Sequence, residues 1–319
     1  MNAPAPATNR ALPTTAAQLG LGIEPLVARK NDPLVTHLRA AIDGQLRVII
    51  ERQQGLRSVD EPEDVHQLRV AVRRLRAILR EEGAVLGEVA SSLRDELKWL
   101  ATAFGEVRDL DVLIEGLTND AAALPEPDRE AFDAVLAAFA ARRSEARKVA
   151  MRTLRTARYR KLLQALADTL QITGHTGDGA PERSAAPGEL IRKPYRKLRK
   201  DIAKIGEVPT DDELHDLRIR GKRLRYSAEF CRPRNGKQAK RTQKLIKATK
   251  RMQTVLGDHN DSVVAEQRLR HLLAEEQLDT PAMLAAGRLI ERHAEQRARH
   301  RVQWRREWAN VDKRARALL

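Results

Sequence analysis

The sequence predicts an all-α protein built from two similar antiparallel helical bundles. Apolar residues recur at three- and four-residue intervals along most of the chain, which is the spacing of one face of an α-helix. A second observation is an internal repeat, in which HQLRVAVRRLRAILR at residues 66–80 is matched by HDLRIRGKRLRYSAEF at residues 215–230. The length of 319 residues is enough for two medium-sized bundles, so a duplicated helical unit is favoured.

Both copies of the repeat, called the signature helices below, place cations on one helix face and apolar residues on the other. With His66 at the origin of a helical wheel, Arg69, Arg73, Arg76 and Arg80 fall within an arc of about 80°. The opposite face of this helix is apolar and carries Val65, Leu68, Val72, Leu75, Ile78 and Leu79. The second copy repeats the cationic arc with His215, Arg218, Lys222 and Arg225, and the apolar face with Leu214, Leu217 and Leu224.

Each cationic row is unfavourable by itself. Like charges three and four residues apart on a helix repel each other, by roughly a few tenths of a kcal/mol per pair. For one isolated arginine-rich helix, the simplest interpretation is a solvated face. The same row occurs twice in this chain, each time headed by a histidine, and this repetition favours a shared binding site for a polyanion.

The composition points to the same class of ligand. The chain has 59 Lys and Arg against 44 Asp and Glu, and the resulting net charge of +15 attracts polyanions. The single cysteine, Cys231, allows no intrachain disulfide and is interpreted as an ordinary helix-end residue. No apolar run approaches the roughly 20 residues of a membrane span, and the N-terminus lacks a secretory signal pattern. We therefore expect a cytoplasmic protein without a membrane partner.

The chain divides into four predicted segments. Residues 1–24 are rich in Ala, Pro and Thr without periodicity, and are predicted to form a disordered tail. Residues 25–175 are expected to form the first bundle, with a turn at residues 55–60. Residues 176–189 are rich in Gly, Pro and Ser and are predicted to be a linker. Residues 190–319 then form the second bundle, which includes a long C-terminal helix.

Two glycine-containing segments, LATAFGEVRDLDVL and MQTVLGDHNDSVV, form a second matched pair. In the first, Gly105 is expected to end one helix and Asp109 to cap the next, and Gly257 and Asp261 are their later equivalents. We assign both aspartates structural roles, as caps or as partners of nearby arginines, because no nucleophile accompanies them. One of the aspartates at 211–212 is the predicted cap of the second signature helix.

Further cations extend the two rows. Lys244 and Lys247 belong to a stripe of lysines that fits a third wall of the basic surface or a solvated flank equally well. Lys250 lies one residue off this stripe but aligns with Lys98 when the two glycine segments are superimposed. The remaining secondary candidates neighbour the rows or belong to the basic segment IRKPYRKLRKDI, and they are Arg74, Arg80, Arg223 and Arg196.

Together these motifs resemble the CHAD family, the conserved histidine α-helical domain. The resemblance rests on three signatures in order: His66-x-x-Arg69 with Arg73, Arg74 and Arg76; His215-x-x-Arg218 with Lys222, Arg223, Arg225 and Tyr226; and the two glycine segments. It covers most of the chain. The resemblance implies two bundles related by a pseudo-twofold axis around a central basic cavity that binds inorganic polyphosphate. It also implies a phosin-like protein at polyphosphate granules.

Our binding hypothesis is that the two rows face each other and hold a phosphate polymer. Arginine grips phosphate oxygens through two parallel hydrogen bonds, while lysine acts as a point charge. An arc that spans ten residues extends about 15 Å along a helix, so it contacts several consecutive phosphates. For the two histidines, two roles remain open: packing or hydrogen bonding within the protein, and direct donation to phosphate, which would strengthen binding at lower pH. No carboxylate or thiol accompanies either histidine, so we expect no metal and no cofactor.

Two other classes of function compete with this hypothesis. Nucleic acid, bound through its backbone without sequence specificity, uses the same cations, although the ten aromatic residues do not interleave with the arcs as a base-stacking platform would. An enzyme acting on polyphosphate normally needs a carboxylate cluster or a phosphate loop. Neither GxxxxGK[ST] nor an ExExK run is present, so we expect a stand-alone, non-catalytic protein without catalytic residues.

Overall fold

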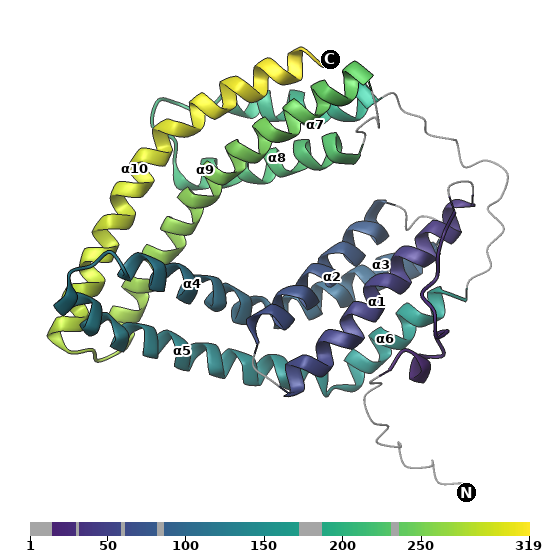
Figure 1. Cartoon of the computed structure of the whole chain (residues 1–319), viewed down its shortest axis with the longest axis horizontal. Helices are drawn as coiled ribbons and strands as arrows, with labels where there is room; N and C mark the ends of the chain where they lie inside the picture. Colours follow the sequence, from purple (N-terminus) through teal and green to yellow (C-terminus); the bar gives the residue numbers. More distant parts are fainter. Residues whose placement is uncertain (1–14, 30–31, 59–60, 82–85, 172–186, 231–235) are drawn as a thin grey trace, which may run out of the picture. The chain divides into compact units, whose positions relative to one another are not determined.

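The computed structural model describes residues 15–29, 32–58, 61–81, 86–171, 187–230 and 236–319 (Figure 1). Within these ranges every regular element is a helix and no strand occurs, which confirms the predicted all-α class. Residues 1–14 of the predicted tail, most of the predicted linker and Cys231 lie outside the described residues.

The helices follow the repeat order expected from the sequence. Before and after the first signature helix, the described elements are η1 (Ala17–Leu19), α1 (Leu34–Ser58), α2 (Pro62–Glu81), α3 (Glu88–Ala103), α4 (Gly105–Ala121), α5 (Glu126–Leu154) and α6 (Ala157–Thr169). The later elements are α7 (Pro187–Ile202), α8 (Asp211–Phe230), α9 (Gly236–Glu275) and α10 (Thr280–Arg316). Helices α2 and α8 are the two signature helices.

The chain forms two compact units whose division differs from the predicted domain boundaries. The first unit comprises Met1–Gly116 and Phe139–Ala180, and the second comprises Leu117–Ala138 and Pro181–Leu319. The end of α4 and the start of α5 therefore belong with the second unit, although the sequence placed them in the first bundle. Ion pairs to α10 account for this difference. The predicted pseudo-twofold axis and central cavity concern the placement of the units, and they stay predictions.

Two contacts attach the α4–α5 connection to the second unit. Asp128, near the start of α5, pairs with Arg288 on α10. Asp120, at the end of α4, lies 3.6 Å from Nε2 of the buried His293 on α10. Such pairs join residues far apart in the sequence, so helical periodicity alone does not indicate them.

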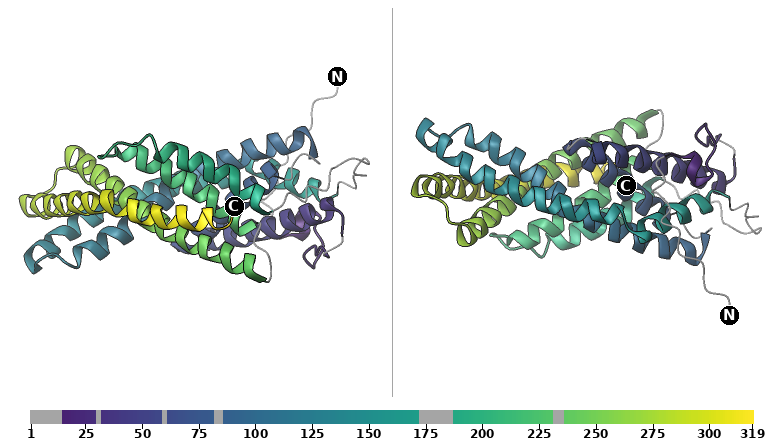
Figure 2. Two further views of the ribbon diagram at one scale, coloured as in Figure 1. Left: turned by 90° about the horizontal axis from the view of Figure 1, so that it is seen from above. Right: turned by 90° about the horizontal axis from the view of Figure 1, so that it is seen from below.

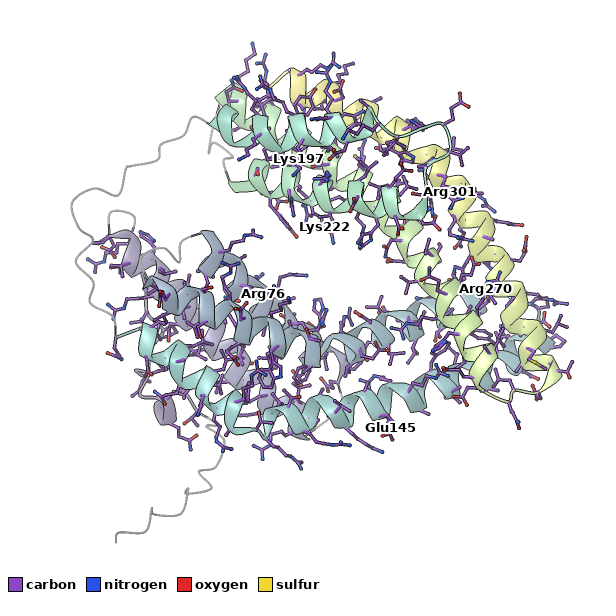
Figure 3. The ribbon with its side chains drawn as sticks, turned by 180° about the vertical axis from the view of Figure 1, so that it is seen from behind. Arg76, Glu145, Lys197, Lys222, Arg270 and Arg301 are labelled. Atoms are coloured by element: carbon purple, nitrogen blue, oxygen red, sulfur yellow. The ribbon has the colours of Figure 1, made fainter. Side chains whose placement is uncertain are left out.

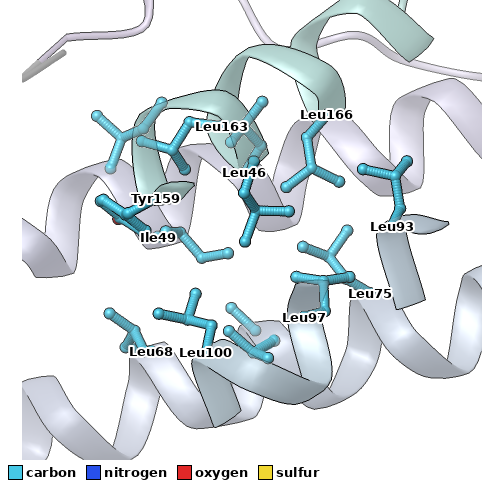
Figure 4. Packing of buried hydrophobic residues seen from close by; sticks show 14 of the residues in the cluster. Leu46, Ile49, Leu68, Leu75, Leu93, Leu97, Leu100, Tyr159, Leu163 and Leu166 are labelled. Carbon is cyan, nitrogen blue, oxygen red and sulfur yellow. The ribbon is translucent and has the colours of Figure 1, made fainter. Parts of the chain in front are cut away.

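In the first unit, the core forms between α1, α2, α3, α6 and the end of α5 (Figure 4). The predicted apolar face of α2 is confirmed: Val65, Leu68, Val72, Leu75 and Leu79 are each no more than 2% exposed. Ile78 is half-buried and packs against the same cluster. One buried hydrogen bond crosses this core, from Tyr159 Oη on α6 to Gln53 Oε1 on α1 at 2.9 Å.

The predicted tail at residues 1–24 is wrong where the structure describes it. Leu19 and Leu21 are buried in the first core. Arg47 on α1 donates from Nη2 to the carbonyl of Gly22 at 2.8 Å, and Asp43 accepts from the backbone N–H of Leu26 at 2.8 Å. A short extended segment held in this way has no helical period, and so composition alone suggested disorder.

The start of α2 is fixed against α1. Arg52 Nη1 donates to Oδ1 of the buried Asp64 at 3.2 Å. A Cβ at Gly55 would lie 2.7 Å from Asp64 Cγ, so only glycine allows α1 to pass this carboxylate. The predicted turn at residues 55–60 therefore begins too early, because α1 continues through Gly55 to Ser58.

In the second unit, α7, α8, α9 and the end of α10 share one core. Leu214, Leu217 and Leu224 of α8 are at most 1% exposed, which confirms the second predicted apolar face. Trp304 of α10 is fully buried in this core, and Trp308 packs against it. Helices α9 and α10 lie side by side over much of their length (Figure 2).

The predicted cap of α8 at residues 211–212 is wrong. Thr210 caps the helix instead: its Oγ1 accepts from the backbone N–H of Glu213 at 3.2 Å, and Glu213 Oε2 accepts from the backbone N–H of Thr210 at 2.8 Å. This reciprocal pair is a capping box. Asp211 is thereby free to contact Arg297 and Arg301 of α10, and it lies 3.2 Å from Nε2 of the buried His259 on α9.

We expect Gly55→Ala and Gly44→Ala, both in α1, to have opposite effects on stability. The new methyl at position 55 collides with Asp64, which costs about 1–3 kcal/mol. A Cβ at Gly44 meets nothing within 4 Å, so alanine there gains up to about 1 kcal/mol of helix propensity. Urea unfolding of the full chain measures both changes, and a stable Gly55→Ala variant would contradict the packing at this crossing.

Stability is expected to fall as the pH is lowered from 7.5 to 5.5. Burial lowers the pKa of His259, Asp211 opposes this shift, and the charges of Arg301, His300 and Arg297 add to it. Because the unfolded state, with a histidine pKa of about 6.5, then binds the proton more readily, stability is full above that pH and is lost below it. His259→Gln should reduce this pH dependence of the melting temperature. His271→Gln, at an exposed position of the same helix, is the control.

Candidate functional site

The first predicted row lies on one face of α2, opposite the buried apolar face. His66, Arg69 and Arg76 are half-buried and Arg73 is exposed, so all four side chains reach solvent from one helix. Figure 3 labels Arg76 on this helix. The helix positions the row because its other face is fixed in the core. We call these four residues the α2 row.

Arg69 is held at the junction of α3 and α4. Its Nη1 donates to the carbonyl of Ala101 in the last turn of α3 at 3.0 Å, which satisfies one of the carbonyls that a helix end leaves open. The same Nη1 lies 3.5 Å from where a Cβ of Gly105 would be, so glycine leaves room for the guanidinium. Its Nη2 is 4.0 Å from Asp109 Oδ1.

The environment of Arg69 is crowded with positive charge. Burial lowers the pKa of Arg69 below its ordinary value, Asp109 acts against this, and Arg73 and Arg108 lower it further. Arg73 and Arg76 form no ion pair with any carboxylate among the residues that the structure describes. The α2 row is therefore short of negative charge.

The second predicted row lies on α8 and repeats this arrangement with different neighbours. Lys222 and the half-buried Arg218 and Arg225 point away from the apolar face, and His215 is exposed (Figure 3). Arg218 lies against Gly257 of α9, with its Nε 3.8 Å from where a Cβ would be. We call His215, Arg218, Lys222 and Arg225 the α8 row.

Each unit thus places the first arginine of its row over the glycine of its second motif. The surroundings differ, because α3 ends before Gly105 whereas α9 continues unbroken through Gly257. The predicted helix caps at Asp109 and Asp261 are consequently wrong, since both residues lie inside helices. The alternative role, that of a partner for a nearby arginine, is the one that Asp109 has toward Arg69.

His215 has a partner that the sequence did not indicate. The amide of Asn260 donates to Asp261 Oδ1 at 3.4 Å, and its Oδ1 lies 2.7 Å from Nδ1 of His215. In this arrangement Nδ1 carries a proton and donates to Asn260, which leaves Nε2 as the second ring nitrogen. The equivalent position in the first unit is Arg108, so comparison of the two copies gave no signal for this contact.

Lys250 is the secondary candidate that the fold brings to a row. Glu229 Oε1 lies 3.9 Å from Arg225 Nε and 4.0 Å from Lys250 Nζ, so one carboxylate joins α8 to α9. The sequence did not single out Glu229. The other secondary candidates are all exposed on their helices, and they are Arg74, Arg80, Lys98, Arg196, Arg223, Lys244 and Lys247.

The geometry suits binding of a polyanion. Rigid helices present the cations, and Arg69 and His215 are oriented by hydrogen bonds, so little freedom is lost on binding. Within the described residues, no group of three or more His, Cys, Asp or Glu side chains is placed to hold a metal ion. None of the described helices is both long and apolar enough to cross a membrane.

Two solved structures share this fold. The crystal structure of the CHAD domain from the plant Ricinus communis has a TM-score of 0.62 and 26% identity, and the match covers 90% of this chain and 94% of that one. PptA from Streptomyces chartreusis has a TM-score of 0.61 and covers 86% of this chain and 98% of that one. Its identity of 18% shows a common fold alone.

Sequence comparison identifies relatives and a family. An uncharacterized protein of each of two Mycobacterium tuberculosis strains, CDC 1551 and H37Rv, is 30% identical over 243 residues. These matches cover 74% of this chain but 45% of each relative, so the chain spans about half the length of the curated relatives it matches. The model of the CHAD domain matches residues 40–270, a range that contains both signature helices and both glycine segments, and the chain therefore belongs to the CHAD family.

Proposed function

We propose that this protein binds inorganic polyphosphate, without altering it chemically, through the α2 row and the α8 row. The observation that supports this most is the lack of compensating charge: Arg73, Arg76 and Arg218 form no ion pair with a carboxylate in the part of the chain that the structure describes. Like-charged neighbours repel in this state. A bound anion would relieve the repulsion.

Several features favour a phosphate polymer over a single small anion. The α2 row extends about 15 Å from His66 to Arg76, which is long enough to contact several consecutive phosphates. Arginines predominate, and their planar donors match phosphate oxygens. The CHAD family, to which the chain belongs, is linked to polyphosphate binding. A protein with this property is expected to gather at polyphosphate granules.

Nucleic acid remains the second candidate ligand. Exposed Tyr226, beside the α8 row, is the feature that favours it, because bases stack on aromatic rings. However, the guanidinium of Arg225 already lies over this ring, 4.8 Å from its centre. The stacking face is therefore shared with a cation of the row, and we favour polyphosphate.

The first test reverses one charge in each row. Arg73→Glu with Lys222→Glu should weaken the binding of long-chain polyphosphate by about 100-fold, because each charge-assisted contact contributes roughly 1.5–3 kcal/mol. Circular dichroism should show unchanged helicity, since neither side chain is buried in a core. Isothermal titration calorimetry of wild type and variant measures the loss.

The matched control is Lys161→Glu with Arg306→Glu. Both residues are exposed, lie outside the rows, and change the net charge equally. Equal losses in the two variants would mean that binding follows net charge and would contradict the proposed rows. Competition with RNA and duplex DNA at equal salt separates the two ligands, and polyphosphate failing to displace nucleic acid would favour the second candidate.

We expect no turnover of the polymer. The wild-type protein incubated with polyphosphate and Mg²⁺ or Mn²⁺ should release no phosphate and leave the chain length unchanged, because no carboxylate cluster for the metal lies among the described residues. Gel analysis of chain length and a phosphate assay measure this. Release that is abolished in the Arg73→Glu, Lys222→Glu variant would show catalysis at the rows.

A further inference from the structure

The first unit contains a second basic surface that the rows do not include. A cavity of about 520 Å³ lies where the last turns of α1 meet the last turns of α5. None of the row residues lines it. Five of its seven lining residues are cations, namely Arg57, Arg147, Lys148, Arg152 and Arg155, and no acidic residue is among them.

The walls of this cavity are held together by a direct contact. Arg147 Nη2 on α5 donates to the carbonyl of Leu56 on α1 at 2.6 Å. Leu56 is buried in the first core. Met151, the other apolar lining residue, is half-buried and packs against that core. The cations are therefore mounted on a fixed base and do not extend from a loose surface.

Helix ends explain part of this charge. Arg57 and Arg152 lie in the last turns of α1 and α5, where a cation stabilises the negative end of the helix dipole. Lys148 pairs with the exposed Glu145 at 2.6 Å, which Figure 3 labels on α5. Arg155 follows the end of α5 and forms no ion pair with a carboxylate of the described residues.

The neighbouring acid reports the field of these cations. The hydrogen bond from Lys148 lowers the pKa of Glu145, and the charges of Lys148 and Arg152 lower it further. Two helix ends of about half a charge each and one exposed carboxylate do not balance five cations around one cavity. The geometry leaves this concave surface strongly positive.

We propose that this cavity binds a compact oligophosphate group, of which triphosphate is the model. Concave arrangement of five cations suits a short, highly charged anion, whereas the α2 row suits an extended chain. The lining has no aromatic residue to stack a base and no carboxylate to bind ribose hydroxyls. The phosphates alone are recognised, whether they are inorganic or belong to a nucleotide. This inference does not rest on the proposed function of the rows.

The experiment is a titration with sodium tripolyphosphate in the full-length Arg73→Glu, Lys222→Glu background, which weakens the rows. One equivalent should bind. Adding Arg152→Glu with Arg155→Glu should weaken this binding by about 100-fold, from about tenfold or more for each charge-assisted contact. Adding Lys161→Glu with Arg306→Glu, the charge-matched control, should change it by less than about threefold.

A milder variant guards against a failure to fold. Arg57→Gln with Arg152→Gln removes two charges without introducing acids, and should weaken binding by about tenfold with unchanged circular dichroism. Equal effects of the cavity and control variants, or no effect of either cavity variant, would overturn the proposal. Long-chain polyphosphate bound through the rows with no tripolyphosphate bound here would overturn this inference alone. The opposite result would overturn only the function proposed for the rows.

Adenosine triphosphate separates the two sources of the group. Affinity equal to or below that of tripolyphosphate, with the same loss in the cavity variants, supports recognition of the phosphates alone. Affinity more than about tenfold higher would require contacts to the nucleoside, and would contradict the chemistry inferred from the lining.

Discussion

Both signature helices must satisfy two opposed requirements. One face of each is buried in a core of leucine and valine, and the other holds a row of positive charges that repel one another. Burial of the apolar face fixes the orientation of the helix. The cations therefore cannot rotate apart, and the repulsion is built into the folded state.

The two units reduce this repulsion in different ways. In the first unit, Arg69 donates to the carbonyl of Ala101 at a break between α3 and α4. In the second unit, α9 is continuous, so no equivalent carbonyl is open, and Glu229 lies between Arg225 and Lys250. Each solution orients part of its row, and each leaves other cations of the row without a carboxylate. Such partial compensation is what a binding face for an anion requires, because full compensation would remove its attraction.

The rows and the cavity of the first unit show two shapes of positive surface. A helix presents cations along a line, which fits an extended polymer, whereas the meeting of α1 and α5 gathers five cations around one hollow. The difference in shape, more than the difference in charge, separates the ligands that the two surfaces favour. Within one unit, therefore, the same residue types serve two distinct kinds of recognition.

The sequence alone determined the helices, their buried faces and the membership of both rows, because helical periodicity is a local property. Val65, Leu68 and Leu75 are buried where the wheel placed them. Only the tertiary structure decided that Thr210 caps α8, that residues 19 and 21 pack into the core, and that Asn260 contacts His215. It also brought Arg57 together with Arg147 and Arg152 at one cavity. These contacts join residues that are far apart in the chain or lack a regular spacing, so they depend on how helices pack and leave no periodic trace in the sequence.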